Sequence, residues 1–231
     1  MARLSKSGLV FFALGACLVW LGLRAGNSLK GLLGLSASLS FLGLGAVYFF
    51  RWPGLLGKTT TGRLLASSYV LFWPYHLLGY GSLVLARILR VEPCQEIAPR
   101  LYLGGRLFPW EESKLKQYGI TSVLDLTCEL SEVGFLRRLP GYHCIPLLDG
   151  DAPSRPELDA AIGFITERLR HGSVYVHCAM GHGRSATVVA GYLLASGETA
   201  DLRSAMERVR GKRPGIRLNA GQQQSLGALK S

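Results

Sequence analysis

One nine-residue segment combines a cysteine, an arginine and two glycines in a spacing that suits phosphoryl-transfer chemistry. It reads His177-Cys178-Ala179-Met180-Gly181-His182-Gly183-Arg184-Ser185. A β-rich run at 173–177 precedes the segment and an apolar run at 185–194 follows it, which predicts a strand, a short loop and a buried helix. Such a loop directs successive backbone N–H groups and the positive end of the helix dipole toward one point. The segment therefore predicts a binding site for an oxyanion.

The side chains of this segment are typical of a nucleophile and an oxyanion ligand. A thiolate is favoured over a thiol near a helix N-terminus and a cation, so Cys178 is the candidate nucleophile toward phosphorus. Arg184 offers a planar fork to two phosphoryl oxygens. Ser185 either donates its hydroxyl to the sulfur or caps the helix. Gly181 and Gly183 are expected to take positive φ angles, which let the loop curl tightly.

The pattern HCxxGxxRS resembles the signature loop of protein tyrosine phosphatases, and the short domain around it is similar to their dual-specificity branch. The resemblance covers about residues 97–229, with 97–105 similar to the family's opening strand and 213–222 to its closing loop and final helix. It implies a phosphomonoester hydrolase that works through a cysteinyl-phosphate intermediate and needs no cofactor. It also implies a phosphate-binding loop made of Ala179, Met180, Gly181, His182 and Gly183.

Members of that family use an aspartate about thirty residues before the cysteine as the general acid. Asp149 and Asp151 are both candidates, and Asp149 is preferred because it directly follows the apolar strand at 145–148. A carboxylic acid there protonates the leaving oxygen and later, as a carboxylate, activates water. The sequence Asp-Gly-Asp before Ala-Pro is also typical of a turn, so at least one of the two aspartates is expected to be structural.

No histidine is predicted to be a nucleophile or a metal ligand. The resemblance implies that His177 is buried and orders the loop through hydrogen bonds. His182 either tunes substrate choice or faces solvent as a spectator, and the second interpretation is preferred. His143 and His171 lie far from any metal-ligand spacing, so no metal is predicted. Four basic residues, Arg155, Lys212, Arg213 and Arg217, are expected to form either a basic rim around the pocket or a solvated face.

Charge divides the chain into two parts. All 15 Asp and Glu residues lie from Glu92 onward, whereas the first 91 residues contain only basic charges. Three stretches, 7–23, 31–50 and 64–86, contain no charged residue and approach or exceed the ~20 residues that cross a bilayer as a helix. We therefore predict a membrane region at 1–91 with about three transmembrane helices and a phosphatase domain at 92–231. Basic residues that flank apolar runs favour a lipid bilayer as partner, and not nucleic acid.

Alternatives exist for each apolar stretch. A cleaved signal peptide is the alternative for the first, and a buried soluble hairpin for the other two. Pro74 is expected to break the hydrogen-bond ladder of the third. Five cysteines without paired spacing indicate free thiols and a reducing compartment, so the catalytic domain of this integral, multi-pass membrane protein is predicted to face the cytoplasm, with the N-terminus outside.

Short strands alternate with amphipathic helices from Ile97 onward, which predicts an α/β fold: a small central sheet flanked by helices, preceded by the α-helical transmembrane region. Strands are expected at 100–103, 121–126, 142–147 and 173–177, and helices at 156–170, 185–195, 199–210 and 219–229. Pro156 is expected in the first turn of its helix.

Two substrate classes compete, and the oligomeric state stays open. The preferred substrate is a phosphoprotein at the membrane. The second is a phospholipid, because the segments at 175–178 and 184–187 are also similar to mitochondrial-type phosphatases that act on phosphatidylglycerophosphate. A tether in the bilayer raises the effective concentration of lipid headgroups near the pocket. An inactive phosphate-binding scaffold is the third hypothesis, and the joint presence of Cys178, Arg184 and an acid argues against it.

Overall fold

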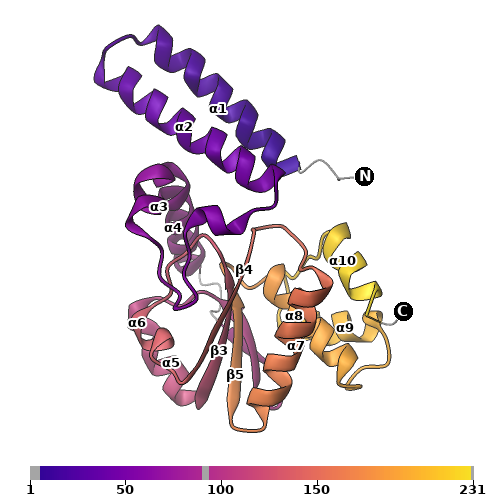
Figure 1. Cartoon of the computed structure of the whole chain (residues 1–231). Coiled ribbons are helices and arrows are strands. Elements are labelled where there is room, and N and C mark those ends of the chain that lie inside the picture. Colours follow the sequence, from indigo (N-terminus) through magenta and orange to yellow (C-terminus); the bar gives the residue numbers. More distant parts are fainter. Residues whose placement is uncertain (1–5, 90–93, 230–231) are drawn as a thin grey trace. The chain divides into compact units, whose positions relative to one another are not determined.

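A computed structural model describes residues 6–89 and 94–229 (Figure 1). The expected domain boundary at Glu92 and Pro93 lies outside the described residues. The chain separates into two compact units. The apolar unit contains residues up to Thr59 together with Leu64–Leu85, and the catalytic unit contains Thr60–Arg63 together with the residues from Ala86 onward.

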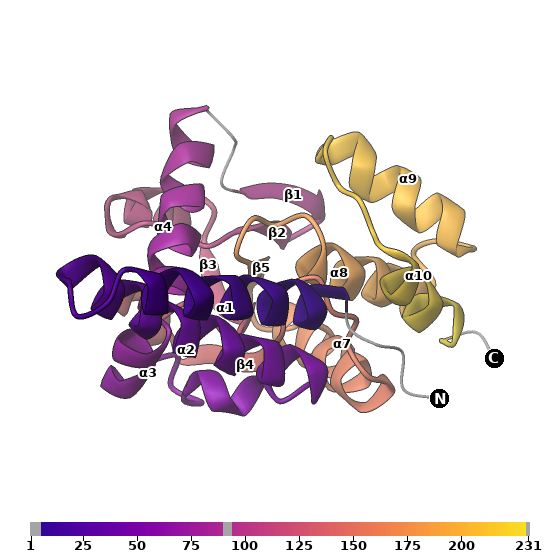
Figure 2. The same cartoon turned by 90° about the horizontal axis from the view of Figure 1, so that it is seen from above.

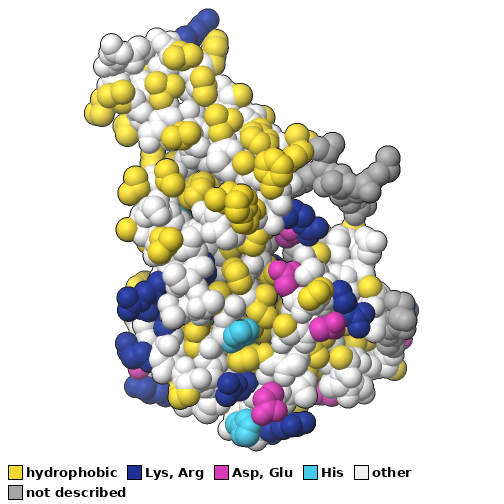
Figure 3. All heavy atoms as spheres, in the orientation of Figure 1, with side chains coloured by type: hydrophobic (Ala, Val, Ile, Leu, Met, Phe, Trp, Pro, Cys, Tyr) yellow, Lys and Arg dark blue, Asp and Glu magenta, His cyan; other side chains and the backbone are white. Residues whose placement is uncertain are grey.

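The apolar unit begins with a helical hairpin made of α1 (Lys6–Arg24) and α2 (Leu29–Phe49). Gly8, Gly15 and Gly22 recur on the buried side of α1 and allow α2 to approach closely. Large hydrophobic side chains are exposed along both helices (Figure 3). By length and hydropathy alone, α1 and α2 are each able to cross a membrane. The first two apolar stretches of the sequence therefore become the two longest helices described.

The third apolar stretch does not form one long helix. After a 3₁₀ turn at Pro53–Leu56, the chain forms α3 (Ala66–Leu71) and α4 (Trp73–Ile88), with a break at Phe72. Pro74 lies in the first turn of α4, where a missing N–H has no cost because the first turn has no helical acceptor for it. The break expected near Pro74 is present, and each of the two helices is shorter than the ~20 residues of a typical spanning helix.

The catalytic unit is built on a mixed five-stranded sheet in the order β1-β2-β5-β3-β4. The strands are β1 (Cys94–Ala98), β2 (Leu101–Gly105), β3 (Ile120–Thr127), β4 (Gly141–Leu147) and β5 (Ser173–Cys178). β1 pairs with β2 in the antiparallel sense, and the other neighbours are parallel. The predicted α/β class is confirmed, and β1 is an additional edge strand that the sequence pattern did not indicate.

Helices cover both faces of the sheet (Figures 1 and 2). One face carries a 3₁₀ turn at Pro109–Glu111 and the short helices α5 (Glu112–Gln117) and α6 (Gly134–Arg137). The larger core lies on the other face, under α7 (Arg155–Leu169), α8 (Arg184–Ala195), α9 (Leu202–Lys212) and α10 (Ala220–Gly227). Pro156 lies in the first turn of α7, as predicted. Central β5 leads into α8, whose residues are almost all buried, so the loop between them is held at both ends.

Candidate active site

The loop between β5 and α8 closes on itself around the cysteine. Gly181 has φ +76°, and its N–H donates to the Sγ of Cys178 at 3.3 Å. A Cβ at Gly181 would lie 2.3 Å from the carbonyl carbon of Gly104, so only glycine fits. The expectation of a positive φ at Gly183 is wrong, because this residue has φ −110°. Its small size matters instead because a Cβ there would meet the side-chain amide of Gln222 at 3.2 Å.

Cys178 lies at the floor of this loop and is only 3% exposed. Its Sγ is 3.3 Å from the Oγ of Ser185, in the first turn of α8. Burial alone raises the pKa of the thiol, but the positive charge of Arg184 and hydrogen bonds from Ser185 outweigh it, so the pKa lies below its usual value. The amide dipoles of α8 act in the same direction. These contacts favour the nucleophilic thiolate.

Arg184 is 1% exposed and uses both terminal nitrogens for contacts within the protein. Nη2 and Nη1 donate to the two oxygens of Glu129 at 2.6 and 2.9 Å, and Nη1 also donates to the carbonyl of Leu147 at 2.8 Å. Burial lowers the pKa of Arg184, but the Glu129 charge more than compensates, so the guanidinium stays protonated. Among the described residues, the buried Nε has no hydrogen-bond partner, which leaves one donor for an oxyanion.

Glu129 is a site residue that the sequence did not indicate. It lies two residues after the end of β3 and is 6% exposed, and its Oε2 also accepts from the N–H of Cys128 at 2.9 Å. A charged residue at the carboxyl end of a buried parallel strand is a signal that could have identified it, because ligands bind at that edge of such sheets.

The two candidate acids differ in their surroundings. Asp149 is exposed, and its Oδ1 lies 3.0 Å from Nη2 of Arg184. The Oδ1 of Asp151 accepts from the N–H of Ala152 at 3.0 Å, and its carbonyl accepts from Gln222 at 3.1 Å. The structure therefore brings Asp149 to the arginine, whereas Asp151 stabilises its own turn.

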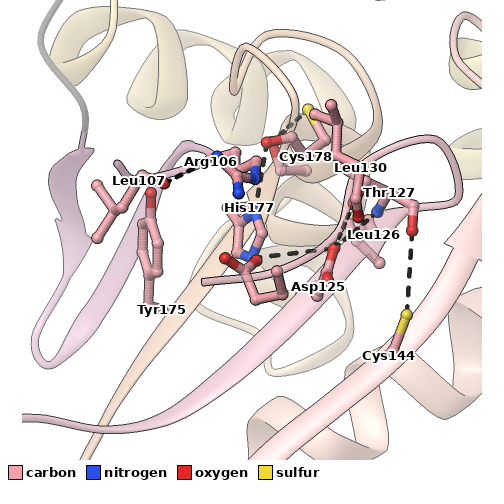
Figure 4. Close-up of polar contacts among 12 residues, drawn as sticks. Arg106, Leu107, Asp125, Leu126, Thr127, Leu130, Cys144, Tyr175, His177 and Cys178 are labelled. Atoms are coloured by element: carbon pink, nitrogen blue, oxygen red, sulfur yellow. Dashed lines mark hydrogen bonds and ion pairs between the residues drawn. The ribbon is translucent and has the colours of Figure 1, made fainter. Parts of the chain in front are cut away.

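His177 is fully buried behind the loop (Figure 4). Its Nδ1 lies 3.3 Å from the carbonyl oxygen of Cys178, and its Nε2 lies 2.8 Å from Oε2 of Glu132. Asp125 is the next carboxylate, with Oδ1 at 3.9 Å from Nε2. The ring is thus buried, as expected, between the cysteine backbone and two buried acids.

Asp125, Glu132 and His177 offer donor atoms within 4.8 Å of one another, a spacing compatible with a metal ion. Protein donors already occupy these carboxylates. Asp125 accepts from the backbone and hydroxyl of Thr127 and from Tyr142, and Glu132 accepts from the N–H of Val133 at 2.6 Å. Hydrogen bonds within the protein therefore occupy Asp125 and one oxygen of Glu132, whereas the other oxygen, Oε2, faces Nε2 of His177 at 2.8 Å.

Of the four basic residues expected to form either a basic rim or a solvated face, one is buried. Arg213 is buried, and it donates to the carbonyls of Gly181 and Met180 at 2.9 Å each, so it supports the loop and does not line a rim. Arg155 pairs with Asp159 at 2.8 Å, while Lys212 and Arg217 are exposed. His182 is half-buried, and burial together with the Arg213 charge lowers its pKa, so the ring is neutral at neutral pH.

A buried thiol of lowered pKa at a helix N-terminus, beside a hydroxyl and a buried arginine, defines a cysteine-based phosphoryl-transfer site. Residues 101–231 match the family described as "Dual specificity phosphatase, catalytic domain". The chain therefore belongs to the dual-specificity phosphatases, and the domain that it carries is that of a phosphoric monoester hydrolase.

Two curated relatives illustrate the match. "Dual specificity protein phosphatase 1" of Arabidopsis thaliana is 34% identical over 52% of this chain and 61% of its own length. "Dual specificity protein phosphatase 12" of Homo sapiens is 30% identical over 54% of this chain and 38% of its own length. The similarity thus spans less than two thirds of either relative.

Solved structures share the fold of the catalytic unit. Tk-PTP in its active form is 29% identical with a TM-score of 0.53, covering 59% of this chain and 95% of that one. The human tyrosine phosphatase-like serine/threonine/tyrosine-interacting protein is 26% identical with a TM-score of 0.54, covering 60% and 95%. PTPMT1 in complex with PI(5)P, 20% identical with a TM-score of 0.53 over 60% and 94%, shares the fold alone.

Proposed function

We propose that the protein is a membrane-anchored phosphoric monoester hydrolase that acts on phosphoproteins through a cysteinyl-phosphate intermediate. The observation that carries the proposal is the site of Cys178, whose thiol has a lowered pKa and lies 3.3 Å from the Ser185 hydroxyl at the N-terminus of α8. The Nε of Arg184, which has no hydrogen-bond partner among the described residues, supplies a charged donor for the phosphoryl oxygens.

The residues support a two-step reaction. In the first step the Cys178 thiolate forms a bond to phosphorus, the bond from phosphorus to the ester oxygen breaks, and Asp149 gives that oxygen a proton. In the second step water attacks phosphorus and passes a proton to the Asp149 carboxylate. The sulfur leaves as a thiolate, stabilised by a hydrogen bond from Ser185. We choose Asp149 over Asp151 because its Oδ1 lies 3.0 Å from Nη2 of Arg184, close to the expected phosphoryl group, whereas Asp151 stabilises its own turn.

A phosphoprotein is the preferred substrate because the curated relatives are dual specificity protein phosphatases. A phospholipid is the second candidate. It is favoured by the exposed apolar side chains of α1 and α2, which would hold the site near lipid headgroups. The fold accommodates a phosphoinositide in PTPMT1, although at 20% identity that likeness concerns the fold only.

We place the catalytic domain in the cytoplasm, because all five cysteines are free thiols and thiolate catalysis needs a reducing compartment. If only α1 and α2 span the bilayer, the N-terminus lies on the same side as the catalytic domain. If α3 and α4 together form a third span, the N-terminus lies outside, as the sequence predicts. Protease protection of tags at the two ends of the chain, in sealed vesicles, distinguishes the arrangements.

One turnover comparison tests the substrate. The full chain in detergent is assayed on a phosphotyrosyl peptide, a phosphoseryl peptide and phosphatidylglycerophosphate, with Cys178→Ser as the inactive control. We expect the highest kcat/KM on a phosphopeptide. A preference for the lipid would transfer the assignment to the second candidate, and turnover by Cys178→Ser equal to that of the unaltered protein would reject the thiolate mechanism.

A further inference from the structure

A four-residue segment of the N-terminal part of the chain belongs to the catalytic unit. Residues 60–63 group with that unit, although the chain up to Thr59 and the chain from Leu64 both belong to the apolar unit. An antiparallel bridge between Lys58 and Leu64 closes the base of this excursion. We name residues 60–63 the strap.

The strap contacts the catalytic unit through Gly62. Its carbonyl accepts from the N–H of Glu132 at 2.7 Å. Its Cα faces the ring of Tyr142, because a Cβ built there would lie 2.2 Å from the Tyr142 hydroxyl and 3.1 Å from the Cβ of Glu132. Gly62 also has φ +77°. Both the backbone angle and the lack of space require glycine at this position.

Of the two residues under the strap, Glu132 lies beside the buried catalytic-loop histidine, and Tyr142 binds Asp125, the next carboxylate to that histidine. Glu132 lies 2.8 Å from Nε2 of His177, and it is 3% exposed. The Tyr142 hydroxyl donates to Oδ2 of Asp125 at 2.8 Å, and the other oxygen of Asp125 lies 3.9 Å from the same Nε2. Burial and the nearby Asp125 charge raise the pKa of Tyr142, so its hydroxyl remains a donor.

The other ring nitrogen of His177, Nδ1, lies near the nucleophile Cys178. Nδ1 of His177 lies 3.3 Å from the carbonyl oxygen of Cys178, and both residues are almost completely buried (Figure 4). Close-packed buried networks do not absorb small displacements, since a change at one member shifts its neighbours. A path of direct contacts therefore runs from Gly62 through Glu132 and His177 to the backbone of Cys178.

From this path we propose that Gly62, Glu132 and Tyr142 are positioning residues of the phosphatase, and that the seated strap sets the geometry of the catalytic loop through His177. The proposal concerns the phosphoryl-transfer chemistry of Cys178 and is independent of whether the substrate is a protein or a lipid.

A matched pair of glycine variants tests the proposal in the full chain. Gly62→Ala places a methyl group against Tyr142 and Glu132. Gly197→Ala is the control, because Gly197 has φ +76° but no atom of the described residues within 4 Å of a built Cβ. Both variants carry the same left-handed strain, of about 1 kcal/mol. Only Gly62→Ala displaces the strap.

We expect Gly62→Ala to lower kcat on p-nitrophenyl phosphate about tenfold or more relative to Gly197→Ala, since displacements of about 1 Å in catalytic groups are costly. We also expect a changed pH profile of Cys178 alkylation by iodoacetamide in Gly62→Ala only, a readout that general destabilisation does not move. Equal kcat values and equal alkylation profiles in the two variants would overturn the proposal.

Hydrogen exchange on the unaltered protein gives a second test that does not depend on the folding of a variant. Coupling between two sites is reciprocal, so a ligand in the catalytic loop must stabilise the seated strap if the strap stabilises the loop. Orthovanadate, a phosphate analogue, is expected to slow exchange in peptides that cover 60–63 and 130–136. Unchanged exchange in both peptides at saturating vanadate, in a sample whose activity is inhibited, would contradict the proposal.

A pair of substitutions at Glu132 separates positioning from packing. Glu132→Gln keeps a polar oxygen that can face Nε2 of His177, whereas Glu132→Ala removes it. If the contact with His177 matters, Glu132→Gln retains most of kcat, and Glu132→Ala loses about tenfold or more with little change in KM. Equal kcat in both variants would show that this contact does not position the loop.

Discussion

Arg184 and Glu129 are joined by two hydrogen bonds, at 2.6 and 2.9 Å, in the buried interior beside the catalytic loop. A buried guanidinium is costly to desolvate unless a carboxylate compensates its charge. The pair fixes the plane of the arginine, because both terminal nitrogens are held while Nε has no hydrogen-bond partner among the described residues. We therefore expect Glu129 to act on catalysis through the orientation of Arg184.

Glu129→Gln is expected to lower kcat/KM by about 10- to 100-fold. Removing one charge of a buried ion pair typically costs about 2–5 kcal/mol, and part of this cost appears as lost stability and not as lost activity. The dissociation constant of orthovanadate should rise in the same variant. Glu112→Gln is the control, since Glu112 pairs with Lys116 at 3.2 Å on an exposed helix surface. Similar kinetics for the two variants would show that Glu129 does not orient the arginine.

Ser185→Ala is expected to raise the pKa of Cys178, because hydrogen bonds from Ser185 are among the causes that lower it. The thiolate form is active, so a higher pKa moves the acid limb of the kcat/KM profile toward higher pH. The same shift should appear in the pH dependence of Cys178 alkylation. Ser196→Ala, at the C-terminal end of the same helix, serves as the control. A shift toward lower pH would contradict the role of the hydroxyl.

The two aspartates are distinguished by the leaving group of the substrate. Asp149→Ala should lower kcat at least tenfold on phenyl phosphate, whose leaving oxygen needs a proton, and far less on p-nitrophenyl phosphate. Asp151→Ala should reduce thermal stability without that selectivity, because its carboxylate holds the N–H of Ala152. If the selectivity appears in Asp151→Ala instead, the assignment of the acid is reversed.

The spacing from Cys178 to Arg184 allowed the catalytic loop to be predicted, since a strand, a glycine-rich turn and a helix are local features of the sequence. Glu129 and Glu132 could not be predicted in the same way. They reach Arg184 and His177 only through the fold of the segment after β3, where no periodic pattern sets a conformation. Contacts between residues far apart in the chain decide the role of such side chains.

Similar reasons explain why Arg213, β1 and Gly183 differ from the expectations based on the sequence. The sequence suggested a surface position for Arg213, because it lies among exposed basic residues. However, Arg213 follows the end of α9, and its side chain reaches the carbonyl of Gly181 in the catalytic loop. The edge strand β1 is short and begins directly after residues outside the described part, so its pattern is too brief to stand out. Gly183 was expected to have a positive φ, but its φ is negative, and a side chain there would instead lack space near Gln222.

The helical hairpin offers a prediction on the apolar unit. A Cβ at Gly15 would lie 2.7 Å from the Cγ of Leu42 and 3.0 Å from its backbone nitrogen. The side chain can move but the backbone nitrogen cannot, so Gly15→Ala must push α1 and α2 apart. Close approach through small residues is the usual source of helix association in lipid, where the hydrophobic effect between helices is absent. Gly15 is therefore expected to be needed for a stable hairpin.

Gly79→Ala, in α4, is the matched control, since a Cβ there meets no atom of the described residues within 4 Å. Each substitution gains about 1 kcal/mol of helix propensity. Overpacking at Gly15 costs about 1–3 kcal/mol, which offsets or exceeds that gain. Thermal unfolding in detergent, followed by circular dichroism, should therefore show a lower Tm for Gly15→Ala than for Gly79→Ala. Equal Tm values or the opposite order would mean that α1 and α2 do not pack closely at Gly15, because the gain in helix propensity is the same for both variants.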